Sequence, residues 1–336
     1  MTSNQPRHTI ALDAMGGDVA PSEPVKGAVL AAREYGLRVL LVGDADAVHT
    51  ELAKYDTTGL PLEVVPSEGV IVEGEHPVLA FRQKPSASVA VAAGLVKDGK
   101  ADAFVTMGST GAAMAVCVLT WGLFPGLNRP ALGGNFIGLA PKTTIVDLGS
   151  QVDVKPAQLL NFATLGCSFA QHYLGVKEPR AGLLSVGSEA GKGNKQVQEA
   201  YALFEKSSLR FVGNVEAHEI FTDKADVIAC DGFVGNVLLK YTEGLGLALE
   251  AYLTEALGPD SPVIEGLSGL ASAAEQGGGP LFGVNGLVII GHGRSKAENI
   301  AHSIFTASDI AAAGLIDAMR NDLSSALETV SAQVEN

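Results

Sequence analysis

The chain alternates short apolar runs with glycine-containing loops and with stretches long enough to form helices. The first run, HTIAL, leads into the loop DAMGGD (residues 13–18) and then into a predicted helix from about Ser22 to Tyr35, which Gly36 ends. The same order recurs at RVLLVG, ADAFVTM, TTIVDLG, AGLLSVG, ADVIACDG and LVIIG. Apolar and polar residues do not alternate strictly in these runs, which indicates strands buried on both faces. The helices between them require parallel crossovers. The sequence therefore predicts a three-layer α/β fold with a mainly parallel sheet.

The chain, at 336 residues, is long enough to bury a large core as one or two domains. No repeat or Pro/Ser-rich linker marks a boundary, so we expect residues 1–336 to form a single unit. The irregular region 123–142 is where that unit would divide into two lobes with a cleft between them. Residues 103–128 carry no charge, but GSTG, Thr120 and Pro125 interrupt them. We interpret this stretch as a buried strand, loop and helix and not as a membrane span.

Charge and cysteine usage narrow the class of protein. Subtracting 37 acidic from 23 basic residues gives a net charge of −14, which argues against non-specific nucleic-acid binding. Cys117, Cys167 and Cys230 are far apart and form no CxxC pair, and the N-terminus has no signal-peptide pattern. Both observations favour a reducing cytoplasm.

Loops at the carboxyl ends of parallel strands are the usual ligand sites of such sheets. The loop DAMGGD lacks GxGxxG spacing, and carboxylates at Asp13 and Asp18 would repel a diphosphate, so a nicotinamide dinucleotide site is disfavoured. The alternative is that both aspartates accept hydrogen bonds from turn amides, and that Gly16 or Gly17 has a positive φ.

Two further loops suit an anion. GSTG, comprising Gly108, Ser109, Thr110 and Gly111, offers main-chain amides and two hydroxyls at a predicted helix N-terminus, although an ordinary capped helix would look the same. SEAGKGN places Lys192 between two glycines, where it could contact a phosphate or could simply be a solvated lysine.

The last two loops combine acidic, amide and basic side chains. In CDGFVGNVLLK, Asp231 follows a strand, and Asn236 and Lys240 lie four residues apart on one helical face. Cys230 is either a nucleophile or a buried structural thiol, and the preceding apolar run favours the latter. In GHGRSK, His292 and Arg294 end the last strand, His292 as a general acid or as a turn residue. No histidine pattern predicts a zinc site.

Taken in order, these elements resemble one family. The stretches IALDAMGGD, ADAFVTMGSTGA, VDLGSQ, LLSVGSEAGKGN, DVIACDGFVGNVLLKYTEG, GGGPLFGVNG and HGRS, from about residue 9 to about residue 315, are similar to bacterial phosphate acyltransferases of the PlsX family. The resemblance implies an isocitrate/isopropylmalate dehydrogenase-like fold and a homodimer. It implies transfer of a fatty acyl group from acyl carrier protein to inorganic phosphate, which gives acyl phosphate for phospholipid synthesis, without a cofactor or metal.

The resemblance also suggests roles for the candidate residues. Phosphate is itself the nucleophile, so the enzyme must hold a dianion near the thioester and stabilise an oxyanion. We expect Lys192, Asn194, Asp231 and Asn236 to be catalytic, with the asparagines donating to the oxyanion. The residues expected to bind phosphate or substrate are Gly108, Ser109, Thr110, Gly111, Lys240, His292 and Arg294. Those expected to line the cleft and order its loops are Asp13, Gly16, Gly17 and Asp18.

Acyl carrier proteins are acidic, so docking on this acidic chain requires a local basic patch. Arg82 with Lys84 is our first choice, and Lys177 with Arg180 is the second. Residues 241–293 hold six acidic residues and no Lys or Arg, which weakens any peripheral contact with an anionic membrane. The alternatives are a short-chain phosphotransacylase that uses acyl-coenzyme A, a dehydrogenase of the same fold, and a non-catalytic protein that binds acyl carrier protein.

Overall fold

The computed structural model describes residues 8–135, 140–258, 261 and 278–334. The chain forms two compact units: residues 1–122 with 275–316, and residues 123–274 with 317–336. The division falls at the start of the irregular region 123–142.

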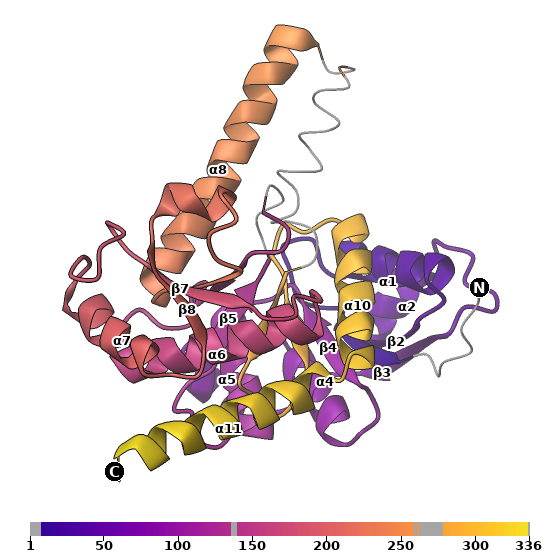
Figure 1. The fold of residues 1–336 in the computed structure, drawn as a ribbon. Helices are drawn as coiled ribbons and strands as arrows, with labels where there is room; N and C mark the ends of the chain where they lie inside the picture. Colours follow the sequence, from indigo (N-terminus) through magenta and orange to yellow (C-terminus); the bar gives the residue numbers. More distant parts are fainter. Residues whose placement is uncertain (1–7, 136–139, 259–260, 262–277, 335–336) are drawn as a thin grey trace. The chain divides into compact units, whose positions relative to one another are not determined.

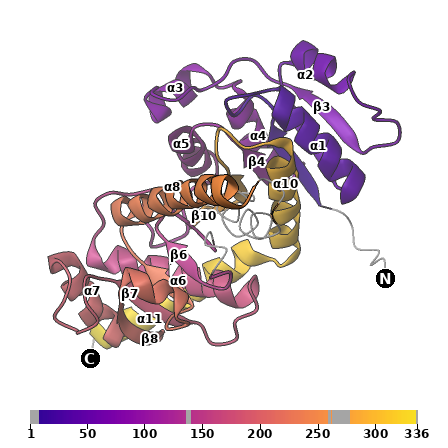
Figure 2. The ribbon, with the colours of Figure 1, turned by 90° about the horizontal axis from the view of Figure 1, so that it is seen from above.

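The first unit is a sheet in the order β3-β2-β1-β4-β11-β10, parallel except for β10. Its strands are β1 (Thr9–Asp13), β2 (Arg38–Gly43), β3 (Leu62–Pro66), β4 (Ala103–Thr106), β10 (Gly279–Phe282) and β11 (Val288–Ile290). Its helices are α1 (Ser22–Glu34), α2 (Ala45–Leu52), α3 (Pro77–Gln83), α4 (Ser88–Lys97), α5 (Thr110–Trp121) and α10 (Ala297–Ala312). Helices α1 and α10 pack together, as do α4 and α5 (Figures 1 and 2).

The second unit is a smaller sheet in the order β5-β6-β9-β7-β8, with β5 antiparallel to β6 and the other pairs parallel. Its strands are β5 (Ala131–Gly134), β6 (Thr144–Val146), β7 (Arg180–Leu184), β8 (Arg210–Val215) and β9 (Val227–Ala229). Its helices are α6 (Pro156–His172), α7 (Lys195–Glu205), the 3₁₀ helix η1 (Ala217–Phe221), α8 (Gly232–Leu257) and α11 (Leu315–Val334), which begins at the border of the units. Helices α6 and α7 pack side by side.

The predicted α/β class with a mainly parallel sheet is confirmed, and the reason is local. Ile10 and Leu12 lie in β1, both are fully buried, and so is Ala11 between them, as a strand covered on both sides requires. Helix α2 begins directly after Asp44, because the Asp44 carboxylate accepts the N–H of Ala47 at 2.8 Å. The sequence reading missed α3 and the strands β5, β8 and β10; β5 lies in the region interpreted as irregular.

The uncharged stretch 103–128 contains a buried strand, a loop and a helix, as predicted: β4 precedes α5, and Ser109 is the N-cap of α5. In the part of the chain that the structure describes, no helix is both long and apolar enough to cross a membrane.

An ion-pair network holds the amino end of β7. Arg180 contacts Asp226 through Nε and a terminal guanidinium nitrogen, both at 2.9 Å, and contacts Asp223 at 2.8 Å. Burial opposes ionisation of Asp226, but its hydrogen bonds with Arg180 outweigh that effect and lower its pKa. Arg180 is therefore occupied within its own unit, which weakens the second-choice docking pair.

Candidate active site

The loop DAMGGD is joined to the GSTG loop by a short relay of hydrogen bonds in the first unit. The Thr106 hydroxyl donates to Asp13 Oδ2 at 2.8 Å and accepts the N–H of Gly108 at 3.0 Å. Asp13 Oδ1 accepts the N–H of Met15 at 3.2 Å. The prediction that the aspartates receive turn amides is thus confirmed for Asp13, and Gly17 supplies the positive φ of 103°.

Asp13 is only 2% exposed and ends a buried strand. Burial raises the pKa of its carboxyl, while hydrogen bonds from Thr106 and the loop amides act in the opposite direction. Asp13 thus bonds the strand end to its own loop and, through Thr106, to the GSTG loop, which is consistent with the expectation that it orders the loops.

The GSTG loop is the N-terminus of α5. The Ser109 hydroxyl accepts the N–H of Ala112 at 3.4 Å, which makes Ser109 a helix cap. The expectation that all four residues offer amides to an anion needs a correction, because the N–H of Gly108 is already bound to Thr106. The amides of Ser109, Thr110 and Gly111 begin the helix, where main-chain donors lack intrahelical partners.

The loop GHGRSK also meets DAMGGD in the first unit. The N–H of Asp18 donates to Gly293 O at 2.7 Å, and the N–H of Ser295 donates to His292 O at 3.0 Å. The main chain of His292 therefore begins a turn; the residue is half-buried, and Arg294 beside it is exposed. Three of the predicted loops thus form one cluster in the first unit.

A buried aspartate that the sequence reading did not single out organises the second unit. Asp147, directly after β6, is fully buried. Its carboxylate accepts the N–H groups of Leu132, Gly149, Ser150 and Gln151, and also the Ser150 hydroxyl. Burial raises the pKa of Asp147, and the Ser150 hydroxyl is the largest opposing influence. The residues VDLGSQ therefore form a tightly bonded loop at the carboxyl edge of the sheet.

Helix α8 begins directly against this loop, which explains the sequence DGFVGN. The Asp231 carboxylate accepts the N–H of Val234 at 2.8 Å and caps the helix. A Cβ at Gly232 would lie 2.8 Å from Asp147 Oδ2, and one at Gly235 would overlap Asp147 O, so only glycine permits the approach. Asn236 lies against Gly149, its Cβ 3.4 Å from the position of a Cβ there.

Two other residues of this segment have partners that limit their chemistry. Lys240 forms an ion pair with Glu243 at 2.9 Å, which compensates the charge expected to bind phosphate. Cys230 is 5% exposed, its thiol faces Asp147 O at 3.5 Å, and burial raises its pKa well above the ordinary value. The prediction of a buried structural thiol is confirmed.

The SEAGKGN loop leads into α7 in the second unit. Asn194 caps this helix, its Oδ1 accepting the N–H of Val197 at 2.9 Å, so its amide NH₂ is the group left to donate to a substrate. The alkyl stem of Lys192 packs over Gly187, where a Cβ would lie 3.0 Å from Lys192 Cγ. Lys192 is exposed and makes no ion pair with any residue that the structure describes.

The two residues of the predicted docking pair, Arg82 and Lys84, differ in whether a neighbouring carboxylate compensates their charge. Lys84 Nζ contacts both carboxylate oxygens of Glu75, at 2.7 and 2.8 Å, and Val70 O at 2.9 Å. Arg82, in the last turn of α3, is exposed. The net positive charge of this patch is therefore carried by Arg82.

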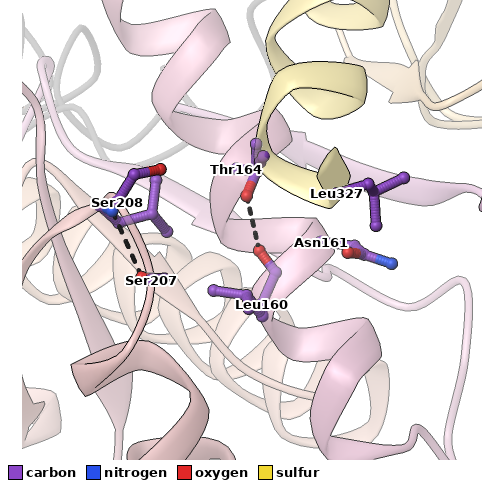
Figure 3. Close-up of a pocket in the computed structure, with 8 residues that line it drawn as sticks. Leu160, Asn161, Thr164, Ser207, Ser208 and Leu327 are labelled. Atoms are coloured by element: carbon purple, nitrogen blue, oxygen red, sulfur yellow. Dashed lines mark hydrogen bonds between the residues drawn. The ribbon is translucent and has the colours of Figure 1, made fainter. Parts of the chain in front are cut away.

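A pocket in the second unit lies between α6, the loop before β8, and α11 (Figure 3). Its lining residues are Leu160, Asn161, Thr164, Ser207, Ser208, Leu209, Ala326 and Leu327. The Thr164 hydroxyl donates to Leu160 O at 3.0 Å, and Ser207 donates to Phe204 O at 2.7 Å. Because the lining holds no charged side chain, this pocket does not suit a phosphate dianion.

Known proteins share this architecture. A phosphotransacetylase from Streptococcus pyogenes superposes with a TM-score of 0.58 at 18% identity, covering 93% of this chain and 94% of that one. A putative 4-hydroxythreonine-4-phosphate dehydrogenase from Salmonella typhimurium gives a TM-score of 0.56 at 14% identity, covering 91% and 100%. At these identities the likeness shows the fold, which is that of phosphotransacetylases and of a dehydrogenase class.

The sequence comparisons show the family. A family profile described as "Fatty acid synthesis protein" matches residues 8–318. The phosphate acyltransferase of Pelotomaculum thermopropionicum is 41% identical over 326 residues, covering 94% of this chain and 95% of the relative. That of Heliobacterium modesticaldum is 41% identical over 333 residues, covering 96% and 99%. The chain belongs to the phosphate acyltransferase family.

Proposed function

We propose that this enzyme transfers a fatty acyl group from acyl carrier protein to inorganic phosphate. A phosphate oxygen attacks the thioester carbonyl carbon, the tetrahedral oxyanion collapses, and the carbon–sulfur bond breaks. The products are acyl phosphate and the carrier thiolate, which takes up a proton. The acyl phosphate supplies phospholipid synthesis.

The observation that carries the proposal is the exposure and position of the Lys192 side chain. It is an exposed ammonium group between two glycines, beside the N-terminus of α7; the Glu189 carboxylate lies near its alkyl stem, but no described residue forms an ion pair with it. A cation and a helix N-terminus together attract a dianion. The amide groups of Asn194 and Asn236 remain our candidates for the oxyanion, while Asp231 acts through the start of α8.

Mixing purified protein, long-chain acyl carrier protein and phosphate tests the reaction. We expect phosphate-dependent loss of thioester, and hydroxylamine should give more hydroxamate with phosphate and enzyme than from the thioester alone, because it also traps the acyl phosphate. Thioester loss at an unchanged rate without phosphate would refute the proposal. A parallel arm with short-chain acyl-coenzyme A distinguishes a phosphotransacylase, and an arm with oxidised nicotinamide dinucleotide distinguishes a dehydrogenase.

We further propose that residues 1–336 act as one catalytic unit in the cytoplasm, as a homodimer. Support for self-association comes from α8, where Phe233, Val237 and Tyr241 recur every four residues and are 60%, 52% and 67% exposed. Sedimentation equilibrium checks the dimer. Since residues 241–293 hold no Lys or Arg, we expect no retention on anionic vesicles.

A further inference from the structure

The turn that carries Lys192 is closed from outside the loop by a buried asparagine. Asn214, in β8, donates from Nδ2 to Glu189 O at 2.9 Å. The same carbonyl accepts the N–H of Lys192, also at 2.9 Å. Asn214 and Lys192 are thus joined through one carbonyl oxygen, although 22 positions separate them in the sequence. A shift of Asn214 would move the turn and the ammonium group that the turn presents.

The backbone of β8 directs Asn214 toward the loop. The register of β7 with β8 shifts between the pairs Ala181–Phe211 and Leu183–Asn214, because β8 holds one extra residue there. Gly213 occupies this bulge with a φ of 88°. Bulges of this kind re-aim the side chain that follows.

The side chain of Asn214 is buried, and the loop is its hydrogen-bond partner. The residue is 1% exposed, and its Oδ1 has no hydrogen-bond partner among the described residues. Within the described part of the chain, the hydrogen bond of its side chain therefore goes to the loop.

A second contact steadies the outer side of the same loop. Gln198, in α7, donates from Nε2 to Gly191 O at 2.8 Å and to Gly193 O at 3.0 Å. Main-chain oxygens on both sides of Lys192 are therefore held, while its ammonium group remains exposed.

We propose that Asn214 is a positioning residue for the phosphate step: it fixes the turn from Glu189 to Lys192 and so sets where the ammonium group meets phosphate. The proposal rests on the proposed function, in which Lys192 contacts phosphate. Asn214 itself does not touch substrate.

A double-mutant cycle tests this proposal. Asn214→Ala should raise the KM for phosphate about five- to tenfold and leave the KM for acyl carrier protein substrate unchanged. In a Lys192→Ala background, Asn214→Ala should add no further rise. An equal rise in both backgrounds would show that Asn214 does not act through Lys192, and an unchanged phosphate KM in the parent enzyme would overturn the proposal outright.

Hydrogen exchange of the peptide covering 187–194 gives a readout that needs no substrate. Exchange should be faster in Asn214→Ala than in the parent, and unchanged in Thr164→Val, which removes a buried hydroxyl from α6 in the same unit. Unchanged exchange in the Asn214 variant would exclude the anchor. Asn214→Leu keeps a similar volume, loses the donor without burying a charge, and serves if the alanine variant does not fold. If Lys192→Ala alone leaves phosphate use intact, the proposed role of Lys192 fails, while exchange still decides whether Asn214 anchors the loop.

Discussion

Lys240 and Glu243 form an ion pair of 2.9 Å one turn apart on α8, whereas Lys192 has no such carboxylate partner in the described part of the chain. We expect Lys192→Met to raise the KM for phosphate at least about tenfold, because it removes an exposed cation that forms no ion pair with a described residue. Lys240→Met should change this constant less than about threefold, because Glu243 already compensates that charge. Steady-state kinetics with phosphate varied at saturating acyl donor measure both, and a larger effect from Lys240 would reverse the assignment.

Gly235 should be intolerant of any side chain. Gly235→Ala forces the start of α8 away from Asp147 O and should cost roughly 1–3 kcal/mol of unfolding free energy. Gly244, in the same helix, has open space around it, so Gly244→Ala should stabilise by about 0.5–1 kcal/mol. Urea unfolding of both variants makes the comparison, and equal effects of the two alanines would contradict the packing described.

Removal of Arg180 should destabilise the protein in a pH-dependent way. The pKa of Asp226 is lowered in the folded state, so its stabilisation is complete above the ordinary value of 3.8 and is lost as pH falls through the lower folded value. Arg180→Met should cost about 2 kcal/mol at pH 7, and the difference from the parent should shrink below about pH 4.

Urea midpoints measured from pH 7 to pH 3 test this behaviour. Arg210→Met is the matched control, because Arg210 and Glu178 form an exposed pair of 3.9 Å whose loss should cost less than about 0.5 kcal/mol. A penalty for Arg180→Met that does not depend on pH would rule out the ion-pair explanation.

The three cysteines should resist alkylation in the native state. All are buried and free, and burial raises the thiol pKa in each, to about 12 for Cys167. Iodoacetamide at about pH 8, below each of these raised values, should label none in folded protein and all three in urea, as read by mass spectrometry. Rapid native labelling of Cys230 would reopen its role as a nucleophile.

Docking of the carrier protein should depend on Arg82 more than on Lys84. Arg82→Glu should raise the KM for acyl carrier protein substrate about fivefold at low salt and flatten its salt dependence, without affecting phosphate. Lys84→Gln should have a smaller effect, since Glu75 already neutralises that charge. If neither change alters the KM for acyl carrier protein substrate, the docking surface lies elsewhere.

The parts of the structure that sequence reasoning predicted are set by neighbours along the chain. The burial of β1 follows from the apolar residues of that strand, and the cap at Asp44 involves a residue only three positions away. Even so, the compensation of Lys240 by Glu243 was missed, although a spacing of three in a helix was readable.

Contacts between distant segments left no such signal. Thr106 and Asp13 are 93 residues apart, and Asn214 and Glu189 are 25 apart. The asparagine in the strand-like run FVGNV gives no indication that it contacts a distant loop. The carbonyl that it meets depends on the order of the strands in the sheet. Of the donors around Asp147, only the N–H of Leu132, 15 residues away, falls in this class; those of Gly149, Ser150 and Gln151 are local, and the sequence reasoning missed them.

The uncharged stretch from 103 to 128 has a consequence for the chain when it is not folded. In the native state most of it is β4 and α5, within the first unit. Once exposed, it carries no like charges to keep neighbouring molecules apart, and chains can associate there faster than they refold. Heating should therefore end in precipitation, and the lifetime of the enzyme at high temperature is set by how slowly the first unit opens.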